Sequence, residues 1–277
     1  MEKIKIEKNT VQETLIIPLY GRKMCSEKFP KFYTDIYAKR LCERLDYDFT
    51  ELEKKNNSFL YEFGALEAAM RQLDIIWEIK EYLKKHPKAS IVNLGCGLDE
   101  TGKACDNGLC HIINVDFPDV IEVRKKLISE GDREKNIARD LKDYSWMDEV
   151  NPAEGAIFFA AGVFHYFKTD EVKALVLELV KRYKAACLVF DSVGKLGLKL
   201  MMSKALKNMG INNVEGLFYV NDPRKELNWS GKIRLSSKGY MLGYYNMKSP
   251  NIRFSHRLLA RIGDSMMKMS INRMEFE

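Results

Sequence analysis

The chain has 277 residues, of which 46% are hydrophobic and 30% are charged, a composition typical of one globular α/β domain. Its longest apolar runs have about eight residues, far fewer than the roughly 20 that a membrane-spanning helix needs. The first ten residues, MEKIKIEKNT, contain no apolar signal core. The net charge of +6 is scattered and no recognised basic motif accompanies it, so we expect neither a membrane nor a nucleic acid as partner.

The six cysteines form no C-x-x-C pair and show none of the usual zinc spacings. Cys105, Cys110 and His111 lie near one another in the sequence, but this grouping is too weak to predict a metal site. Since nothing indicates a disulfide framework, the simplest expectation is a protein of the reducing cytoplasm.

Residues 1–88 are expected to form a helical N-terminal cap. The segment KFYTDIYAKRLCERL predicts a helix, and DYDFTELEKKNN predicts a loop or a ragged helix. From residue 65 to residue 85 the apolar residues recur at helical spacing, and His86-Pro87 ends this pattern.

Residues 89–192 alternate between strand and helix patterns. The expected strands are 90–95, 111–116, 136–140, 155–162 and 186–192. The expected helices are 119–131, ended by Gly131, and 169–184. Basic runs such as RKK at 124–126 are interpreted as solvated helix faces. This alternation predicts a doubly wound, mostly parallel α/β sheet.

After Ser192 the pattern changes. Residues 193–250 are expected to form a lid over the carboxyl edge of the sheet, inserted after the fifth strand and beginning with a methionine-rich helix at 196–210. The Met and Tyr residues of this region either fill the core or line a substrate site. A closing helix and strand are expected in 251–277, so that residues 1–277 form a single domain.

The segment SIVNLGCGLDE (90–100) carries the most informative motif. Gly95 permits a tight turn after the first strand of the core, and Gly97 permits a ligand to approach the main chain closely. Asp116 ends the next strand about 20 residues later, where an acid can accept the two hydroxyls of a ribose. The sequence therefore predicts a nucleoside cofactor at the carboxyl edge of the sheet.

The same segment argues against a nicotinamide cofactor. The G-x-G-x-x-G motif requires a third glycine where this chain has Glu100, and Asp99 and Glu100 together would repel a diphosphate. A cofactor without phosphates fits better, and S-adenosylmethionine is the obvious candidate.

Five segments, taken together, resemble the leucine carboxyl methyltransferase family, and within it the bacterial O-methyltransferases related to polyketide biosynthesis. They are TLIIPLYGRKM (14–24), RLDYDF (44–49), VNLGCGLDE (92–100), VDFPDVIEVRKKL (115–127) and FFAAGVFHYF (158–167). The resemblance implies a Rossmann-like methyltransferase fold, with S-adenosylmethionine as cofactor and a small molecule as substrate.

The resemblance also assigns residues to the cofactor. Arg71 and Arg22 would hold its amino-acid carboxylate, although Arg71 also fits a solvated charged stripe with three acids of its helix, and Arg22 fits a surface charge. Asp116 would bind the ribose, or else cap a helix. Asp140 and Leu141 would flank the adenine, unless Asp140 only caps its loop.

The remaining candidate residues follow the first and fourth strands of the core. Cys96 and Phe117 accompany the glycine turn and the ribose acid. Ala161 stands where many relatives carry a glutamate that helps to hold the cofactor. Tyr166 is expected to pack near the cofactor. His165 is the one candidate for a catalytic role, and a satisfied polar residue beneath the lid is its alternative interpretation.

Methyl transfer from a sulfonium has a neutral leaving group, so the enzyme mainly has to align the reacting atoms. A carboxylate is already ionised at neutral pH and needs no general base, whereas a phenol would need one. We therefore expect methylation of a carboxylate on a small aromatic or polyketide-like acid. The alternatives are a phenolic or other hydroxyl acceptor, a degenerate adenosyl-binding protein, and, least favoured, a nicotinamide oxidoreductase.

Overall fold

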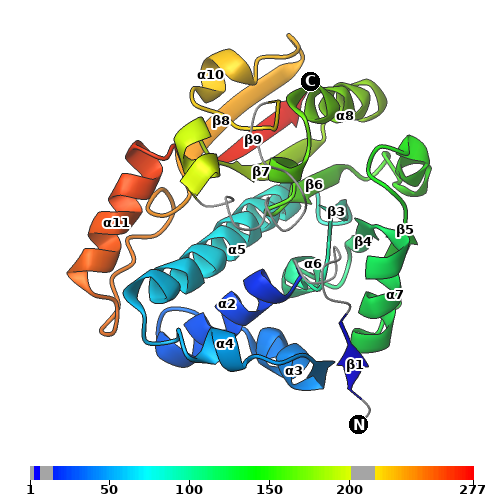
Figure 1. Ribbon diagram of the computed structural model, residues 1–277. Coiled ribbons are helices and arrows are strands. Elements are labelled where there is room, and N and C mark those ends of the chain that lie inside the picture. The colour runs from blue at the N-terminus through cyan, green and yellow to red at the C-terminus, as the bar shows by residue number, and fades with distance from the viewer. Residues whose placement is uncertain (1–2, 7–14, 201–215) are drawn as a thin grey trace.

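The centre of the molecule is a seven-stranded sheet with the strand order β5-β4-β3-β6-β7-β9-β8 (Figure 1). We describe it from a computed structural model that covers residues 3–6, 15–200 and 216–277. The strands are β3 (Ser90–Leu94), β4 (His111–Asp116), β5 (Glu134–Ala138), β6 (Ala156–Ala160), β7 (Cys187–Ser192), β8 (Ile233–Gly239) and β9 (Ser270–Phe276). The first five run parallel, and β9 runs antiparallel between β7 and β8. The expected mostly parallel α/β sheet is confirmed.

Strand order reverses beside β3, which pairs with β4 on one side and with β6 on the other. In such a sheet the loops that leave the carboxyl ends on the two sides of the reversal diverge and leave a crevice between them. The loops that follow β3, β4 and β6 therefore meet at one edge, where the sequence places the cofactor.

Two long helices cover the two faces of the sheet. α5 (Phe59–Lys85) packs its apolar side on one face, in a core that includes Ile91 and Phe159. α8 (Thr169–Arg182) packs on the other face, against Phe158 and its neighbours. Because alternate residues of a strand point to opposite faces, the adjacent Phe158 and Phe159 belong to different cores.

The N-terminal part consists of short elements that precede α5. Its elements are β1 (Ile4–Lys5), α2 (Ile16–Lys28), α3 (Ile36–Arg44), β2 (Leu45–Asp46) and α4 (Thr50–Glu53). α2 lies along α5, and Gly21 allows a close approach, because a Cβ there would lie 3.4 Å from the Cβ of Ala68. This contact brings the middle of α2 to the carboxyl edge of the sheet.

Several short elements complete the fold: α6 (Thr101–Ala104), α7 (Pro118–Leu127), η1 (Tyr144–Glu149), η2 (Phe164–Tyr166), α10 (Pro223–Glu226) and α11 (Phe254–Ser265). α7 ends before Gly131, with Ile128 as its C-cap, so the expected glycine stop is wrong. The solvated reading of RKK is wrong for Arg124, which is 1% exposed, and right for Lys125 and Lys126.

The region expected as a lid contains regular structure that the sequence pattern did not reveal, since β8 and α10 lie within it. Residues 195–200 are helical, and the rest of the predicted methionine-rich helix lies outside the described residues. Tyr240, Met241 and Met247 are buried in the core, so core filling is the correct reading for these three. The closing elements α11 and β9 lie where a helix and a strand were expected.

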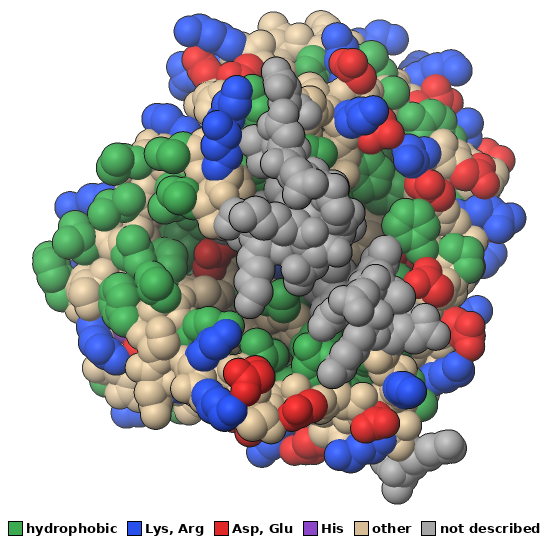
Figure 2. All heavy atoms as spheres, in the orientation of Figure 1, with side chains coloured by type: hydrophobic (Ala, Val, Ile, Leu, Met, Phe, Trp, Pro, Cys, Tyr) green, Lys and Arg blue, Asp and Glu red, His purple; other side chains and the backbone are tan. Residues whose placement is uncertain are grey.

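α11 presents apolar side chains to solvent. Phe254, Leu258 and Met266 are exposed, and Figure 2 shows hydrophobic side chains gathered on this side of the molecule. Its opposite side, with Ala260 and Gly263, is buried. None of the described lining residues of the cavity introduced below comes from α11.

Within the described residues, no helix is both long enough and apolar enough to cross a membrane. The same residues contain no group of His, Cys, Asp and Glu side chains that could hold a metal ion, and Cys105 and Cys110 are buried free thiols.

The acids that accompany Arg71 along α5 are not a solvated face, which corrects one interpretation of the sequence. Glu67 accepts a hydrogen bond from the Tyr240 hydroxyl, and Glu78 pairs with Arg273 at 2.6 Å. Asp74 is fully buried, and neither of its carboxylate oxygens has a partner among the described residues. Burial, together with nearby Asp264 and Glu78, raises the pKa of Asp74 to about 9, although Lys238 opposes the shift.

This raised pKa predicts a pH-dependent stability. Between about pH 4 and pH 9 the unfolded chain releases the Asp74 proton while the folded chain keeps it, so the free energy of unfolding falls as pH rises, by at most about 1.4 kcal/mol per pH unit. Asp74→Asn removes this term. Urea unfolding from pH 5 to 9 should show a stability advantage of Asp74→Asn that widens with pH. The exposed control Asp132→Asn should show no such trend, and a constant gap for Asp74→Asn would contradict the assignment.

Candidate functional site

A cavity opens at the carboxyl edge of the sheet, between α2, α5 and the loops that follow β3, β4, β5 and β6. Ten of the residues singled out in the sequence line it: Arg22, Arg71, Gly95, Cys96, Gly97, Asp116, Phe117, Leu141, Ala161 and Tyr166. Asp140 and His165 are not among the lining residues. The fold thus brings together residues that lie as far apart in the sequence as α2 and the loop after β6.

Both glycines of the turn after β3 have backbone angles that favour glycine. Gly95 has φ +68° and Gly97 has φ +50°. A Cβ on Gly95 would lie 2.7 Å from a methyl carbon of Val163, and one on Gly97 would lie 2.9 Å from Leu15. The missing side chains therefore allow a left-handed turn and close packing by the neighbouring loops, while the turn itself lines the cavity.

Asp116 ties this turn to the end of β4. Its two carboxylate oxygens accept hydrogen bonds from the backbone N–H groups of Gly97, at 2.7 Å, and Phe117, at 2.8 Å. Burial raises the pKa of Asp116, and these two bonds act against the rise. α7 has no side-chain cap, so the helix-capping alternative does not hold. Each carboxylate oxygen has a further lone pair with which it can accept a bond in the cavity.

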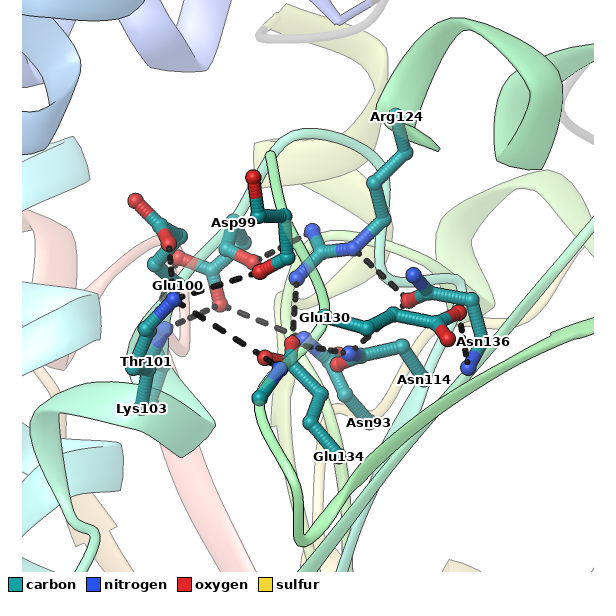
Figure 3. A network of polar contacts seen from close by, with 12 residues as sticks. Asn93, Asp99, Glu100, Thr101, Lys103, Asn114, Arg124, Glu130, Glu134 and Asn136 are labelled. Carbon is teal, nitrogen blue, oxygen red and sulfur yellow. Dashed lines mark hydrogen bonds and ion pairs between the residues drawn. The ribbon is translucent and has the colours of Figure 1, made fainter. Parts of the chain in front are cut away.

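A buried polar network supports the turn from behind (Figure 3). Arg124, on α7, donates to the carbonyl oxygens of Gly97 at 3.1 Å and Asp99 at 2.7 Å. Its guanidinium also donates to Asn136 at 3.0 Å and faces Glu134 at 3.4 Å. The network satisfies carbonyl groups that the irregular turn would otherwise leave buried without donors.

The two acids after the turn have different surroundings. Asp99 lines the cavity and accepts hydrogen bonds from Gln72 at 3.1 Å and from the Thr101 hydroxyl at 2.9 Å. Glu100 is not a lining residue, and its carboxylate lies 3.6 Å from the Lys103 ammonium. Of these two acids, only Asp99 places its carboxylate at the cavity wall.

Arg22 is a buried residue of α2 rather than a surface charge. Its Nε lies 2.9 Å from a carboxylate oxygen of Asp35, and its Nη2 lies 3.8 Å from Asp99. Burial works to lower the pKa of Arg22, but the Asp99 and Asp35 charges and Tyr33 raise it overall, so the guanidinium stays protonated.

Arg71, on α5, pairs with Asp191 at the end of β7 and not with Asp74. The Arg71 Nη1 lies 3.3 Å from Asp191 Oδ2. The other oxygen of Asp191 accepts the N–H of Gly162 at 2.6 Å. Burial alone would raise the pKa of Asp191, yet Arg71 and His165 hold it below its usual range.

The two candidates outside the cavity have local partners. The His165 Nε2 lies 3.3 Å from Asp191, and its Nδ1 is buried without a partner among the described residues. Asp140 is partly exposed and accepts a hydrogen bond from the N–H of Lys142, which is the geometry of a loop cap. Ala161 lines the cavity but brings no polar group to it.

Sequence reasoning missed Asp191, the inward role of Asp99 and the buried Arg124. Asp191 had a usable signal, since it is an acid at the carboxyl end of a central strand. Asp99 was interpreted only as a repulsive charge. Arg124 also had a signal, because its helical spacing from Val120, Ile121 and Leu127 places it on the apolar side of α7.

Residues 19–180 match the profile of a family described as leucine carboxyl methyltransferase. The chain is 28% identical over 266 residues to the tetracenomycin polyketide synthesis O-methyltransferase TcmP of Streptomyces glaucescens, covering 90% of this chain and 95% of that protein. It is 27% identical over 247 residues to the S-adenosyl-L-methionine-dependent methyltransferase dpfgK of Gibberella zeae, covering 81% and 80%.

Solved structures give the same fold. The plantazolicin methyltransferase BamL, solved with a triazolic desmethylPZN analog and SAH, aligns with 96% of this chain and 99% of its own, at a TM-score of 0.52 and 14% identity. At that identity the likeness concerns the fold alone.

The buried network predicts that Arg124 holds the turn. Arg124→Met should lower the free energy of unfolding by about 3–5 kcal/mol, because it leaves the carbonyls of Gly97 and Asp99 without their donor and takes the guanidinium away from the Glu134 carboxylate. Lys126→Met, which removes an exposed pair with Glu122, should cost at most about 1 kcal/mol. Urea unfolding measures both, and similar losses for the two variants would show that Arg124 does not support the turn.

Proposed function

Because this chain belongs to the leucine carboxyl methyltransferase family, it is an S-adenosylmethionine-dependent methyltransferase, and we propose that it methylates a carboxylate oxygen of a small acid. The observation that carries the proposal is the set of side chains at the cavity. Asp116, the buried Arg22 and the partly buried Arg71 all line the cavity, and no histidine is among the described lining residues.

The residues present fit the cofactor. Asp116 keeps acceptor capacity for the ribose hydroxyls, and Leu141 offers an apolar surface for the adenine. Arg71 and Arg22 are protonated donors for the carboxylate of the methionine moiety. Asp140 is not a lining residue, and its carboxylate already accepts a hydrogen bond from the N–H of Lys142. The structure therefore supports a role for Asp140 at the adenine amine less well.

The bound cofactor supplies an activated methyl group, so the chain has to orient the acceptor and exclude water. Apolar side chains of Leu15, Leu19, Val163 and Phe167 line the cavity together with the polar groups. A dry, partly apolar wall of this kind suits a small acid whose ring or chain packs there while its oxygen meets the methyl group.

A carboxylate acceptor agrees with the titratable groups at the cavity. It is ionised at neutral pH and needs no proton acceptor. Burial raises the pKa of Tyr166, so this phenol stays protonated and is unsuited to act as a base. The His165–Asp191 pair is the one feature that favours the alternative, a phenolic acceptor, but its imidazole is not among the lining groups. The O-methyltransferase TcmP supports transfer to oxygen in either case.

S-adenosylhomocysteine should therefore bind and raise the melting temperature, whereas NAD should not. Asp116→Ala should weaken binding of S-adenosylhomocysteine by about 1.5–3 kcal/mol, the usual worth of hydrogen bonds to a charged group. Titration calorimetry measures the loss, with the exposed neighbour Asp119→Ala as control. Binding of NAD without S-adenosylhomocysteine would contradict the proposal.

A carboxylate acceptor also predicts a rate that is nearly flat from about pH 6 to 9, because its ionisation is complete below that range. His165→Ala should leave the shape of this profile unchanged. The readout is transfer of labelled methyl groups to a panel of small aromatic acids and phenols.

The product gives a separate check, since a methyl ester releases volatile methanol in mild base and an aryl methyl ether does not. Label that stays bound after alkali, or a rate that rises with pH only while His165 is present, would favour the phenolic alternative.

A further inference from the structure

Asp191 is a buried charge for which the proposed function has no direct use. It is 2% exposed at the end of β7 and is not among the lining residues of the cavity. Its carboxylate contacts Arg71, Gly162 and His165, which all belong to the protein itself. A buried carboxylate is costly unless its partners compensate for the lost water, so this arrangement calls for a reason.

The contacts of Asp191 fix both the Arg71 side chain and the turn on which it rests. Gly162, with φ +71°, donates its N–H to Asp191 at 2.6 Å. A Cβ on Gly162 would lie 2.6 Å from Arg71 Nη1, so the guanidinium occupies the space that a side chain at this position would take. The Asp191 carboxylate therefore fixes the position of the Arg71 side chain relative to the backbone at Gly162.

The pairing leaves most of the guanidinium free. Among the described residues, Asp191 is the only hydrogen-bond partner of the guanidinium, and it engages Nη1 alone. Arg71 lines the cavity, and an arginine has five N–H donors in a planar fork. The remaining donors are thus available to a second carboxylate, which a fork held in one orientation can bind through two parallel bonds.

The geometry points to Asp191 as a positioning residue, which orients Arg71 to bind the carboxylate of the cofactor's methionine moiety. This inference rests on the proposed function. His165 Nε2 lies 3.3 Å from Oδ2, the same oxygen of Asp191 that pairs with Arg71, and so gives the carboxylate a further contact that restricts it. In this arrangement His165 acts on the cofactor only through Asp191 and Arg71.

Charge and orientation predict opposite effects at Asp191, which makes the inference testable. Removal of a negative charge 3.3 Å from Arg71 would strengthen attraction of another carboxylate, if charge alone mattered. If orientation decides, Asp191→Asn weakens binding, because the amide cannot serve Arg71, Gly162 and His165 as an acceptor through both of its terminal atoms.

The experiment compares two nucleosides by titration calorimetry. S-adenosylhomocysteine carries the amino-acid carboxylate, and 5′-methylthioadenosine lacks it. Asp191→Asn should lose about tenfold in affinity for S-adenosylhomocysteine and less than threefold for 5′-methylthioadenosine. Arg71→Ala should show the same selectivity. In the Arg71→Ala background, Asp191→Asn should cost nothing further, because the two residues act as one unit.

Two further variants complete the comparison. Gly162→Ala would place a Cβ 2.6 Å from Arg71 Nη1 without a change of charge, so it should reproduce the selective loss. Because φ at Gly162 is +71°, the free energy of unfolding of this variant is measured beside its affinities. Asp148→Asn breaks an exposed pair with Arg182 and should change neither affinity.

Three results would overturn the inference. Tighter binding of S-adenosylhomocysteine by Asp191→Asn would mean that Asp191 opposes the cofactor, and equal losses for both nucleosides would mean that its role is structural. If Asp191→Asn leaves the affinity for S-adenosylhomocysteine unchanged while Arg71→Ala lowers it, the inference about Asp191 is wrong and the proposed function still holds. Wild-type protein that binds neither nucleoside would instead remove the proposed function itself.

Discussion

The site depends on how the backbone leaves β3. Between Leu94 and Thr101 the chain turns over the carboxyl edge of the sheet through two glycines in the left-handed conformation. This turn belongs to no helix or strand, so regular secondary structure does not pair its backbone groups. Its N–H groups are therefore bound by Asp116 and by the carbonyl of Val115, and its carbonyls by Arg124. Since both side chains come from β4 and α7, one strand–helix unit determines the position of the cavity floor.

Three arginines at or behind the cavity each pair with one acidic side chain. Arg22 pairs with Asp35, Arg71 with Asp191 and Arg124 with Glu134, and all three guanidinium groups are largely buried. A buried pair adds little net stability, but it restricts a long side chain to one orientation. Arg124 uses its remaining donors on the turn, whereas Arg71 and Arg22 face the cavity. The same chemistry thus serves structure in one case and, in our proposal, ligand binding in the other two.

Much of this arrangement was predictable from the sequence because it is local. The β3 turn, the acid that ends β4 and the long periodic helix α5 each show their pattern within a short window. The partners of Arg71 and the burial of Glu67, Asp74 and Glu78 were not predictable in this way. They depend on β7, β8 and the segment after β8, which are far away in sequence and are brought to α5 only by the folded sheet. A charged stripe on a helix looks the same in sequence whether water or another segment covers it.

The position of β9 has a consequence for how the molecule is made. In the described sheet β8 pairs only with β9, and β9 also covers the outer edge of β7, the strand that carries Asp191. During synthesis β7 and β8 therefore each have an unpaired edge until residues 270–276 are translated and pair with them. The parallel half of the sheet can assemble while the chain is still growing. The surroundings of Arg71 and Asp191 are finished only after β9, which follows every other strand of the described sheet in the sequence, has been translated.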